Sequence, residues 1–396
     1  MLPFNEARER ILQGVGRLGS ERVALRAAAG RVLAEDVRAE EPLPRFDHSA
    51  MDGYALAAGD VAGAGPFWLP VRGESRAGVP WAQLAPGTAC QIFTGAALPA
   101  GADAVLAVEE TQARDAGIEF RVAPKAGQHV RRRGEDLAQG QLALEAGMRL
   151  GAYHLGLAAG VDRVELSVAR RPHVIIVGTG DELRAPGQPG PATSIPESNG
   201  LSIAVLAESA GASAELAPRV ADQQEALRER LSRALDACDL LVTIGGVSVG
   251  RYDLVRPALE AAGAELDFWK VQIKPGKPLV YGRRGTTRIL GLPGNPVSAQ
   301  LTFGLFGLPL LRALQGQRDA VPRFERARLL TALHQRPGRQ GFYRALWSPA
   351  GVTPVDNQAS GNVLSLAYAD ALISVPADSE GYEAGAEVEI LRVALL

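Results

Sequence analysis

The chain has 396 residues, of which 46% are hydrophobic and 22% are charged, and its formal net charge is −2. This length exceeds what a single hydrophobic core serves, so roughly two to four globular domains are expected. The near-neutral charge argues against a nucleic-acid-binding protein that works by bulk charge. The two cysteines, Cys90 and Cys238, form no C-x-x-C pair, which indicates neither a disulfide framework nor a zinc site and suits a reducing cytoplasm.

The N-terminal region is predicted to begin with helix. Residues 5–18 place apolar side chains on one helical face, and residues 23–38 are typical of a second helical piece followed by a strand. The first residues lack the apolar core of a signal peptide, so a cytoplasmic protein is expected.

A polar segment, FDHSAMDGYAL at residues 46–56, follows two prolines. Its acidic, imidazole and hydroxyl side chains are concentrated in a turn-rich stretch. Such a concentration is more typical of a functional site than of core packing. The alternative is a simple Asx-turn at Asp52 and Gly53.

Residues 57–140 are rich in Gly, Pro, Val and Thr and have little helical period, so they predict a small β domain. Thr94 follows a short strand, where a hydroxyl can contact a ligand or simply turn the chain. The run VRRRGED at 130–136 is either a solvated charged face or a phosphate site. We expect residues 41–140 to be a β domain inserted into a helical domain made of residues 1–40 and 141–169.

Residues 170–315 alternate strands and helices, which predicts a doubly wound, mostly parallel α/β domain. The strands are expected at residues 174–177, 214–220 and 240–244, and the helices at residues 199–210, 222–237 and 254–262. Asp222 and Glu225 have the spacing of a capping box. Ligands of such sheets bind beyond the carboxyl ends of the strands, where the loops Gly178–Glu182 and Gly245–Asp253 are expected.

The stretch LLVTIGGVSVGRYD at residues 240–253 has the pattern of a buried strand, a glycine loop and a helix start. Such a loop can place backbone N–H groups around a phosphate or oxyanion. The alternative is a tight turn with Asp253 as helix cap. The stretch matches neither a Walker loop nor a G-x-G-x-x-G dinucleotide motif.

A basic segment, FWKVQIKPGKP at residues 268–278, follows. Lys270 and Lys274 are four residues apart, which in one strand puts both on one face. Prolines stiffen the loop that presents Lys274 and Lys277, and fixed lysines suit an oxyanion, although solvated loop lysines are the alternative. In LPGNPVS at 292–298, Pro296 is expected at the first helical position with Asn295 as cap.

Two long segments complete the chain. Residues 289–311 are uncharged over a membrane-like length, but their prolines and polar residues favour a loop and a buried helix over a membrane span. Residues 322–396 are β-rich and contain RPGRQGFYRA with Arg339 and Arg344.

Eight motifs in this order resemble those of the molybdopterin molybdenumtransferase family, which includes the E domain of gephyrin. They are FDHSAMDGYA, IFTGAALPAGADAV, VRRRGED, GTGDEL, TIGGVSVGRYD, FWKVQIKPGKP, GLPGNPVSA and PGRQGFYRA, and they span nearly the whole chain. The resemblance implies a homodimer with an active site shared between protomers, and a C-terminal β barrel-like domain at residues 322–396. It also implies insertion of molybdate into adenylylated molybdopterin, with AMP release and Mg²⁺.

The resemblance also assigns site residues. The catalytic positions that match the family are Asp52, Thr94, Asp136, Glu182, Asp222, Asp253, Lys270 and Lys274. Glu182 and Asp253 are expected to hold Mg²⁺. The expected substrate-binding residues are Gly245, Gly246, Ser248, Gly250, Lys277, Pro293, Gly294, Asn295, Ser298, Arg339 and Ser365.

Two departures from the family pattern bear on these assignments. An Asp-Ser-Asn motif appears here as Glu197-Ser198-Asn199, and an expected pair of serines appears as Leu364-Ser365. A molybdopterin adenylyltransferase and a non-catalytic gephyrin-like scaffold are the alternative functions. Contacts with an adenylyltransferase or a molybdoenzyme are the expected protein partnerships, and neither nucleic acid nor membrane is expected.

Overall fold

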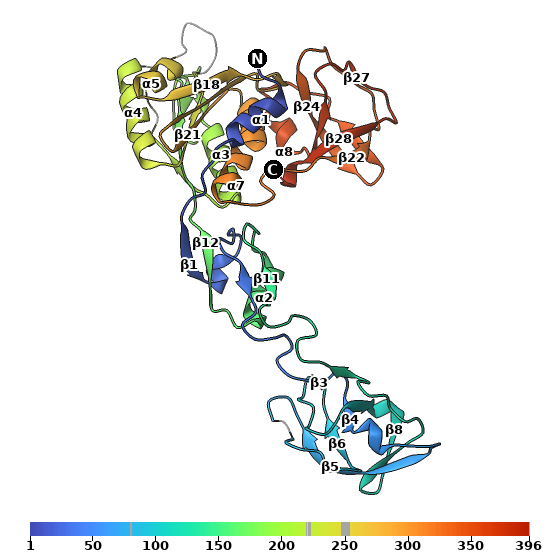
Figure 1. Ribbon diagram of the computed structural model, residues 1–396. Helices are drawn as coiled ribbons and strands as arrows, with labels where there is room; N and C mark the ends of the chain where they lie inside the picture. The colour runs from blue at the N-terminus through green and yellow to red at the C-terminus, as the bar shows by residue number, and fades with distance from the viewer. Residues whose placement is uncertain (80, 219, 221–222, 247–253, 396) are drawn as a thin grey trace.

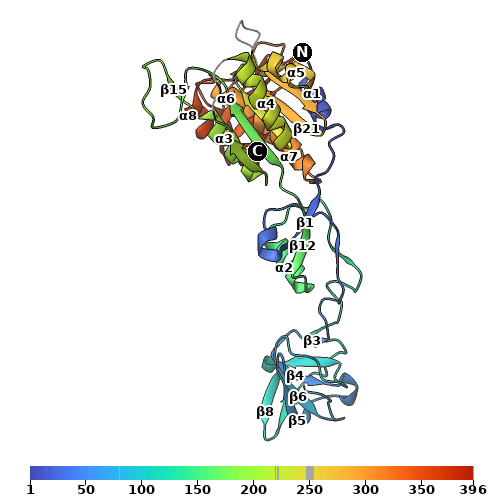
Figure 2. The same ribbon diagram turned by 90° about the vertical axis from the view of Figure 1, so that its left-hand side faces the viewer.

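The computed structural model describes residues 1–79, 81–218, 220, 223–246 and 254–395. These residues form an elongated molecule, with an α/β domain and a C-terminal β domain side by side at one end (Figures 1 and 2). A small middle domain follows, and the inserted β domain lies at the far end. The predicted fold class, multidomain α/β plus β, is confirmed.

The inserted domain is a β domain, as predicted. Its described strands form a six-stranded sheet in the order β7-β4-β6-β5-β9-β8. The strands are β4 (Gly53–Leu56), β5 (Phe67–Ser75), β6 (Ala89–Ile92), β7 (Ala104–Ala107), β8 (Thr111–Arg114) and β9 (Gly117–Phe120). A two-stranded pair, β3 (His48–Ser49) with β10 (Val130–Arg131), lies between this sheet and the middle domain (Figure 1).

The middle domain is built from two separate stretches of chain around one small apolar cluster. Strand β1 (Ser20–Ala24) pairs with β12 (Glu165–Ala169), and β2 (Val37–Arg38) pairs with β11 (Leu142–Leu144). Helix α2 (Ala152–Gly160) packs on the short 3₁₀ helix η1 (Leu25–Ala28). The residues predicted as a helical piece followed by a strand, 23–38, contain the end of β1, the 3₁₀ helix η1, irregular turns and then β2, but no α-helix.

Helix α1 (Phe4–Leu12) is shorter than the predicted residues 5–18 and lies with the α/β domain. Phe4, Ala7 and Ile11 belong to the α/β core, and the Tyr281 hydroxyl donates to Ile11 O at 3.0 Å. From the sequence, this helix was instead predicted to belong to one domain with residues 141–169. Its apolar face has no partner there, whereas Phe306 and Phe342 meet Phe4 edge-on.

The α/β domain carries the predicted sheet, in the order β16-β13-β17-β21-β20-β18. The strands are β13 (His173–Gly178), β16 (Ser213–Leu216), β17 (Leu240–Ile244), β18 (Glu265–Lys270), β20 (Pro278–Arg284) and β21 (Thr287–Leu292). Strands β16, β13, β17 and β21 are parallel to one another, whereas β20 pairs antiparallel with both β21 and β18. Every residue of β17 is buried, which explains its uncharged sequence.

Helices cover both faces of this sheet, so the doubly wound prediction is confirmed. On one face, α1, α3 (Asn199–Ser209), α6 (Pro296–Thr302) and α7 (Leu308–Leu314) surround the larger core. On the other, α4 (Gln224–Ala237) and α5 (Val255–Ala261) surround the smaller one. Gln223 at the cap position of α4 makes no side-chain cap bond, and Asp222 of the predicted capping box lies outside the described residues.

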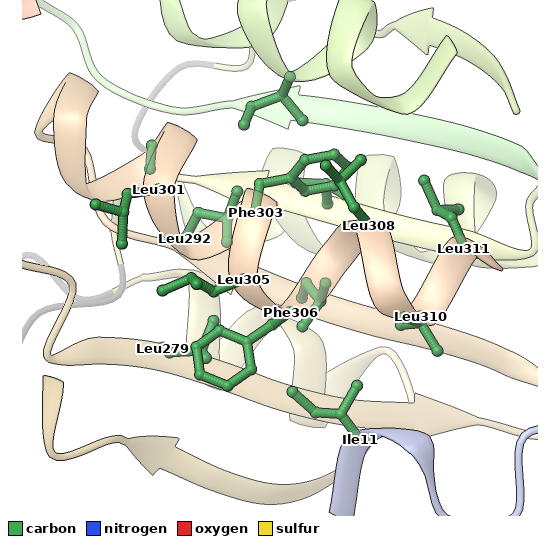
Figure 3. Packing of buried hydrophobic residues seen from close by; sticks show 14 of the residues in the cluster. Ile11, Leu279, Leu292, Leu301, Phe303, Leu305, Phe306, Leu308, Leu310 and Leu311 are labelled. Atoms are coloured by element: carbon green, nitrogen blue, oxygen red, sulfur yellow. The ribbon is translucent and has the colours of Figure 1, made fainter. Parts of the chain in front are cut away.

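The apolar segment of membrane-like length is a helix of the core. Helices α6 and α7 join through the π-helical turn η4 (Phe303–Gly307) into one helix, Pro296–Leu314, that is long and apolar enough to cross a membrane. However, 89% of its most apolar 18-residue stretch is buried inside the protein. Figure 3 shows Phe303, Phe306 and their leucine neighbours along this helix, with Ile11 of α1 at the edge of the same cluster.

The C-terminal domain is barrel-like, as predicted. Its sheet has the order β19-β24-β26-β28-β22, and β25 pairs with β24. The strands are β19 (Ile273–Lys274), β22 (Glu325–Arg328), β24 (Gln340–Ser348), β25 (Gly351–Pro354), β26 (Ala371–Val375) and β28 (Glu387–Arg392). A bridge between Leu329 and Val352 brings the end of β22 to β25 and closes the barrel. The smaller elements are β23 (Leu333–His334), β27 (Gly381–Tyr382), α8 (Val363–Ala367) and η5 (Val393–Leu395).

The prediction of one strand through Lys270 and Lys274 is wrong. Lys270 ends β18 of the α/β sheet, whereas Lys274 belongs to β19, which pairs with β24 of the C-terminal sheet. The chain crosses between the two domains at this point because Val271 and Ile273 are both buried in their shared core. The two lysines therefore lie on different sheets.

Candidate active site

The direction in which strands are added to the sheet reverses between β13 and β17. After β13 the chain forms β16 on one side of β13, and it then crosses to form β17 on the other side. Hydrogen bonds tie the carboxyl ends of the three central strands together. Thr179 N donates to Ile244 O at 3.0 Å, and Gly245 N donates to Leu292 O at 3.0 Å. Open α/β sheets bind their ligands at such a switch point.

A pocket of about 540 Å³ opens there, which we call the switch-point pocket. It is lined by Gly178, Thr179, Gly180, Glu182, Leu183, Ile195, Pro196, Glu197, Ser198, Asn199, Ile244, Gly245, Gly246, Pro278, Pro293, Gly294, Asn295, Pro296 and Ser298. The pocket includes seven of the predicted site residues: Glu182, Gly245, Gly246, Pro293, Gly294, Asn295 and Ser298.

Two of its glycines are required by the backbone. Gly245 has φ +86°, and a Cβ there would lie 2.9 Å from Thr179 O. Gly246 has φ +62°, and a Cβ there would lie 2.6 Å from Val255 Cγ2. A side chain at either position would be strained and would clash with these neighbours. The loop therefore carries no side chain at these two positions, and its backbone borders the pocket.

Two helix N-termini meet this pocket. Helix α3 starts at Asn199, and the long helix beginning with α6 starts at Pro296, after the cap position Asn295. The predicted positions of Asn295 and Pro296 are confirmed. However, the Asn295 side chain does not cap the helix, because its Nδ2 donates to Ser360 Oγ at 3.1 Å. Helix N-termini attract anions, so the pocket suits a phosphate-bearing ligand.

A second pocket of about 380 Å³ adjoins the first and shares Pro278 and Ser298 with it. We call it the basic pocket, because it is lined by Lys274, Pro275, Gly276, Lys277, Pro278, Ser298, Arg339, Phe342, Tyr343, Arg344, Gln358, Ala359 and Ser360. Four of these side chains are cationic and none is acidic. This lining suits a tetrahedral oxyanion.

Arg344 lines the basic pocket, although it was not among the site residues predicted from the sequence. It is only 1% exposed, and no described carboxylate pairs with it. Its Nε donates to Ser365 Oγ at 3.1 Å, and Nη2 donates to the carbonyls of Asn357 and Ala359. Burial lowers the pKa of this guanidinium. A charged residue in the otherwise apolar strand GFYRAL was the signal that could have found it.

Ser365 and Lys270 lie outside both pockets. Ser365 is buried behind the basic pocket, where it holds Arg344, so it orients a cation and does not line the cavity itself. Lys270 lies at the end of β18 and lines neither pocket.

The inserted domain places two predicted residues together. Asp52 Oδ1 accepts hydrogen bonds from the backbone N–H of Thr94 at 2.7 Å and from its hydroxyl at 2.8 Å. These two bonds hold the pKa of the exposed Asp52 carboxyl below its usual value. Asp136 forms an ion pair with Arg131 of β10. Figures 1 and 2 show that the inserted domain lies far from the α/β domain of the same chain.

Four predicted residues, Ser248, Gly250, Asp253 and Asp222, lie outside the described residues. Among the described ones, no group of three or more His, Cys, Asp or Glu side chains has the arrangement of a metal site. Glu182 supplies one carboxylate to the switch-point pocket, and Glu197 supplies a second, whose Oε1 accepts from Gly200 N at 2.7 Å. Mg²⁺ bound largely by substrate phosphates and water needs only one or two protein carboxylates, so these donors fit it.

The fold and the two pockets define a multidomain protein with one pocket that suits a phosphorylated small molecule and an adjoining pocket that suits an oxyanion. Three family models match the chain: "MoeA N-terminal region (domain I and II)" at residues 2–161, "Probable molybdopterin binding domain" at residues 175–313, and "MoeA C-terminal region (domain IV)" at residues 326–393.

Curated relatives cover nearly the whole chain. Molybdopterin molybdenumtransferase 2 of Mycobacterium tuberculosis is 37% identical over 93% of this chain and 94% of its own. The molybdopterin molybdenumtransferase of Haemophilus influenzae is 36% identical over 88% of this chain and 86% of its own. The crystal structure of a molybdopterin biosynthesis MoeA protein from Pyrococcus horikoshii has a TM-score of 0.88 and 29% identity, over 99% of this chain and 100% of its own. The chain belongs to the molybdopterin molybdenumtransferase family, and it is an enzyme of molybdenum cofactor biosynthesis.

Proposed function

We propose that the protein inserts molybdate into adenylylated molybdopterin and releases AMP, with Mg²⁺ as cofactor. One observation carries this proposal: the switch-point pocket and the basic pocket adjoin each other and share Pro278 and Ser298. A reaction between a phosphorylated pterin and an oxyanion needs two such sites within reach of each other.

The switch-point pocket holds the pyrophosphate of the adenylylated substrate. The narrow Gly245–Gly246 loop and the N-termini of α3 and α6 supply backbone N–H groups and positive dipole ends to its phosphoryl oxygens. Ser248 and Gly250, which continue this glycine loop in sequence, are assigned to the same role on the family resemblance.

The basic pocket holds molybdate. Lys274, Lys277, Arg339 and Arg344 line it, and Ser365 orients Arg344 from behind. Their charges balance the dianion before reaction and stabilise the negative charge that develops on the oxygens during transfer. Ser298 lies at the boundary between the two pockets.

Glu182, with Asp253, is the proposed holder of Mg²⁺. When bound, the ion would neutralise charge on the pyrophosphate and polarise the bond to AMP. Asp222 and Lys270 are proposed as catalytic residues on the family resemblance alone. The protein is proposed to work in the cytoplasm, with molybdopterin adenylyltransferase and molybdoenzymes as its protein contacts.

The working form is proposed to be a homodimer with a shared active site. Asp52, Thr94 and Asp136 match the family's functional positions, yet the chain's own pockets lie far from the inserted domain (Figure 1). A second copy would bring its inserted domain to these pockets. Tyr153 and Val164 of the middle domain are 94% and 78% exposed, and such apolar side chains support self-association.

Reconstitution of an apo-molybdoenzyme tests this function. The protein is incubated with adenylylated molybdopterin, molybdate and Mg²⁺, and the product is transferred to the apoenzyme, whose activity is measured. Full activity is expected only when all three are present. Equal activity with unadenylylated molybdopterin, or without this protein at the same molybdate concentration, would contradict the proposed reaction.

A further inference from the structure

Asn199 is an amide that is almost entirely buried beside the switch-point pocket. It is the first residue of α3 and is 8% exposed. Its Nδ2 donates to Gly294 O at 2.8 Å. Because the carbonyl can only accept, this bond fixes which end of the amide faces Gly294. The Oδ1 atom faces elsewhere, and it is buried without a hydrogen-bond partner among the described residues.

The bond to Gly294 holds one wall of the pocket. Gly294 lies in the loop between β21 and α6, and a Cβ there would lie 3.7 Å from Gly245 Cα. This loop therefore lies against the glycine loop that follows β17. Asn199 connects the N-terminus of α3 to the loop between β21 and α6. Both helix N-termini are therefore joined to this one loop.

A buried amide with a hydrogen bond at only one of its two ends joins two elements at a cost in folding stability. An unpaired buried acceptor destabilises a fold, whereas an apolar residue of similar size would leave no such cost. Residues that cost stability in this way are concentrated at functional sites. The position of Asn199 on the pocket wall is consistent with that pattern.

We propose that Asn199 is a positioning residue, which sets the spacing of the α3 and α6 N-termini and so the affinity of the switch-point pocket for a nucleotide phosphate. The inference rests on the proposed function, in that AMP is the nucleotide. The basic pocket does not include Asn199, so oxyanion affinity is independent of it.

The chain offers a matched control at the opposite end of the same helices. Gln315 is 3% exposed, its Nε2 donates to Ala210 O after α3 and to Leu311 O in α7, and its Oε1 is likewise buried without a described partner. Gln315→Ala therefore removes a comparable buried amide from the same pair of helices, but far from the pocket. Its effect on stability is the reference for Asn199→Ala.

The test is AMP titration of the whole protein in the presence of Mg²⁺, followed calorimetrically, with molybdate binding and thermal unfolding measured alongside. Asn199→Ala is expected to weaken AMP binding about tenfold. Gln315→Ala is expected to lower the unfolding temperature similarly and leave AMP binding within about twofold. Molybdate binding is expected to be unchanged in both.

Asn199→Asp adds a readout that a purely structural role would not move. A neutral carboxyl can donate to Gly294 O, but a carboxylate cannot, and burial favours the neutral form. The loss of AMP affinity relative to wild type is therefore expected to be larger near pH 8 than near pH 5.5. Glu182 and Glu197 face the same pocket in both proteins, so the ratio of AMP affinities to wild type removes their contribution.

Equal AMP affinity in Asn199→Ala and Gln315→Ala would overturn this inference while leaving the proposed function intact. A wild-type protein that binds molybdate but no AMP would instead contradict the proposed function, and this inference with it.

Discussion

Mixed dimers made from Asp52→Ala and Glu182→Ala chains are expected to be active, although each variant alone is inactive. Each single variant should lose on the order of 100-fold or more in rate, as expected when a group at the reacting centre is removed. In the heterodimer one of the two shared sites carries both substitutions and the other carries neither. Purified heterodimer should therefore regain about half of the wild-type activity.

The reason lies in the shape of the chain. Asp52 is held by Thr94 in the inserted domain, whereas Glu182 lines the switch-point pocket of the α/β domain. Figures 1 and 2 show these domains at opposite ends of one protomer. The proposal that both carboxylates act on one substrate therefore requires a second copy of the chain to supply one of them.

The experiment uses chains with two different affinity tags, so that heterodimers are separated from both homodimers and weighed by mass spectrometry. The two homodimers serve as inactive controls. Confirmed heterodimers without recovered activity would contradict the shared site. Activity of either homodimer near the wild-type level would show that the substituted carboxylate has no part in the reaction.

Lys274→Ala is expected to raise the molybdate concentration for half-saturation by about tenfold or more, because one charge-assisted contact is lost. Lys274 lines the basic pocket, and its ammonium also lies 5.6 Å from the centre of the Tyr343 ring. It does not line the switch-point pocket, so AMP affinity should stay within about twofold of wild type.

Two further variants sharpen this prediction. Lys274→Arg keeps the charge and should recover most of the molybdate affinity. Arg323→Ala removes one positive charge from a side chain that is 85% exposed and lies in neither pocket, so it controls for net charge. If Lys274→Ala and Arg323→Ala shift half-saturation equally, the assignment of Lys274 to molybdate is wrong.

The sequence predicted those parts of the fold whose pattern is local. The strand at residues 240–244 is uncharged because both of its faces are buried, and it lies where it was predicted. The helix predicted at residues 199–210 is α3, which ends just before Gly211 for an equally local reason, since φ of Gly211 is +90°. Alternation of such elements was enough to predict the doubly wound sheet.

Contacts between domains could not be predicted in this way. Nothing in residues 4–12 says that Phe4 meets Phe306 and Phe342, which are distant in sequence. The lysines at 270 and 274 fit one strand by spacing, yet the chain passes from one sheet to another between them. Period and spacing describe an element, but they do not identify the surface on which it packs.

The candidate site likewise combines features that a local pattern predicts with features that depend on contacts between distant residues. Glycines and prolines marked the loops of the switch-point pocket, because those residue types have a direct backbone meaning. The roles proposed for Arg344 and Asn199 depend on partners such as Ser365 and Gly294, and these contacts appear only in three dimensions.

The measurement that tests the proposed reaction most directly is AMP release from adenylylated molybdopterin with Mg²⁺, in the presence and absence of micromolar molybdate. We predict AMP release that depends on molybdate, with one molybdenum bound to the pterin for each AMP released. Equal release without molybdate would contradict insertion and indicate a hydrolase on this fold. Tight AMP binding with no release under either condition would contradict it in favour of a scaffold.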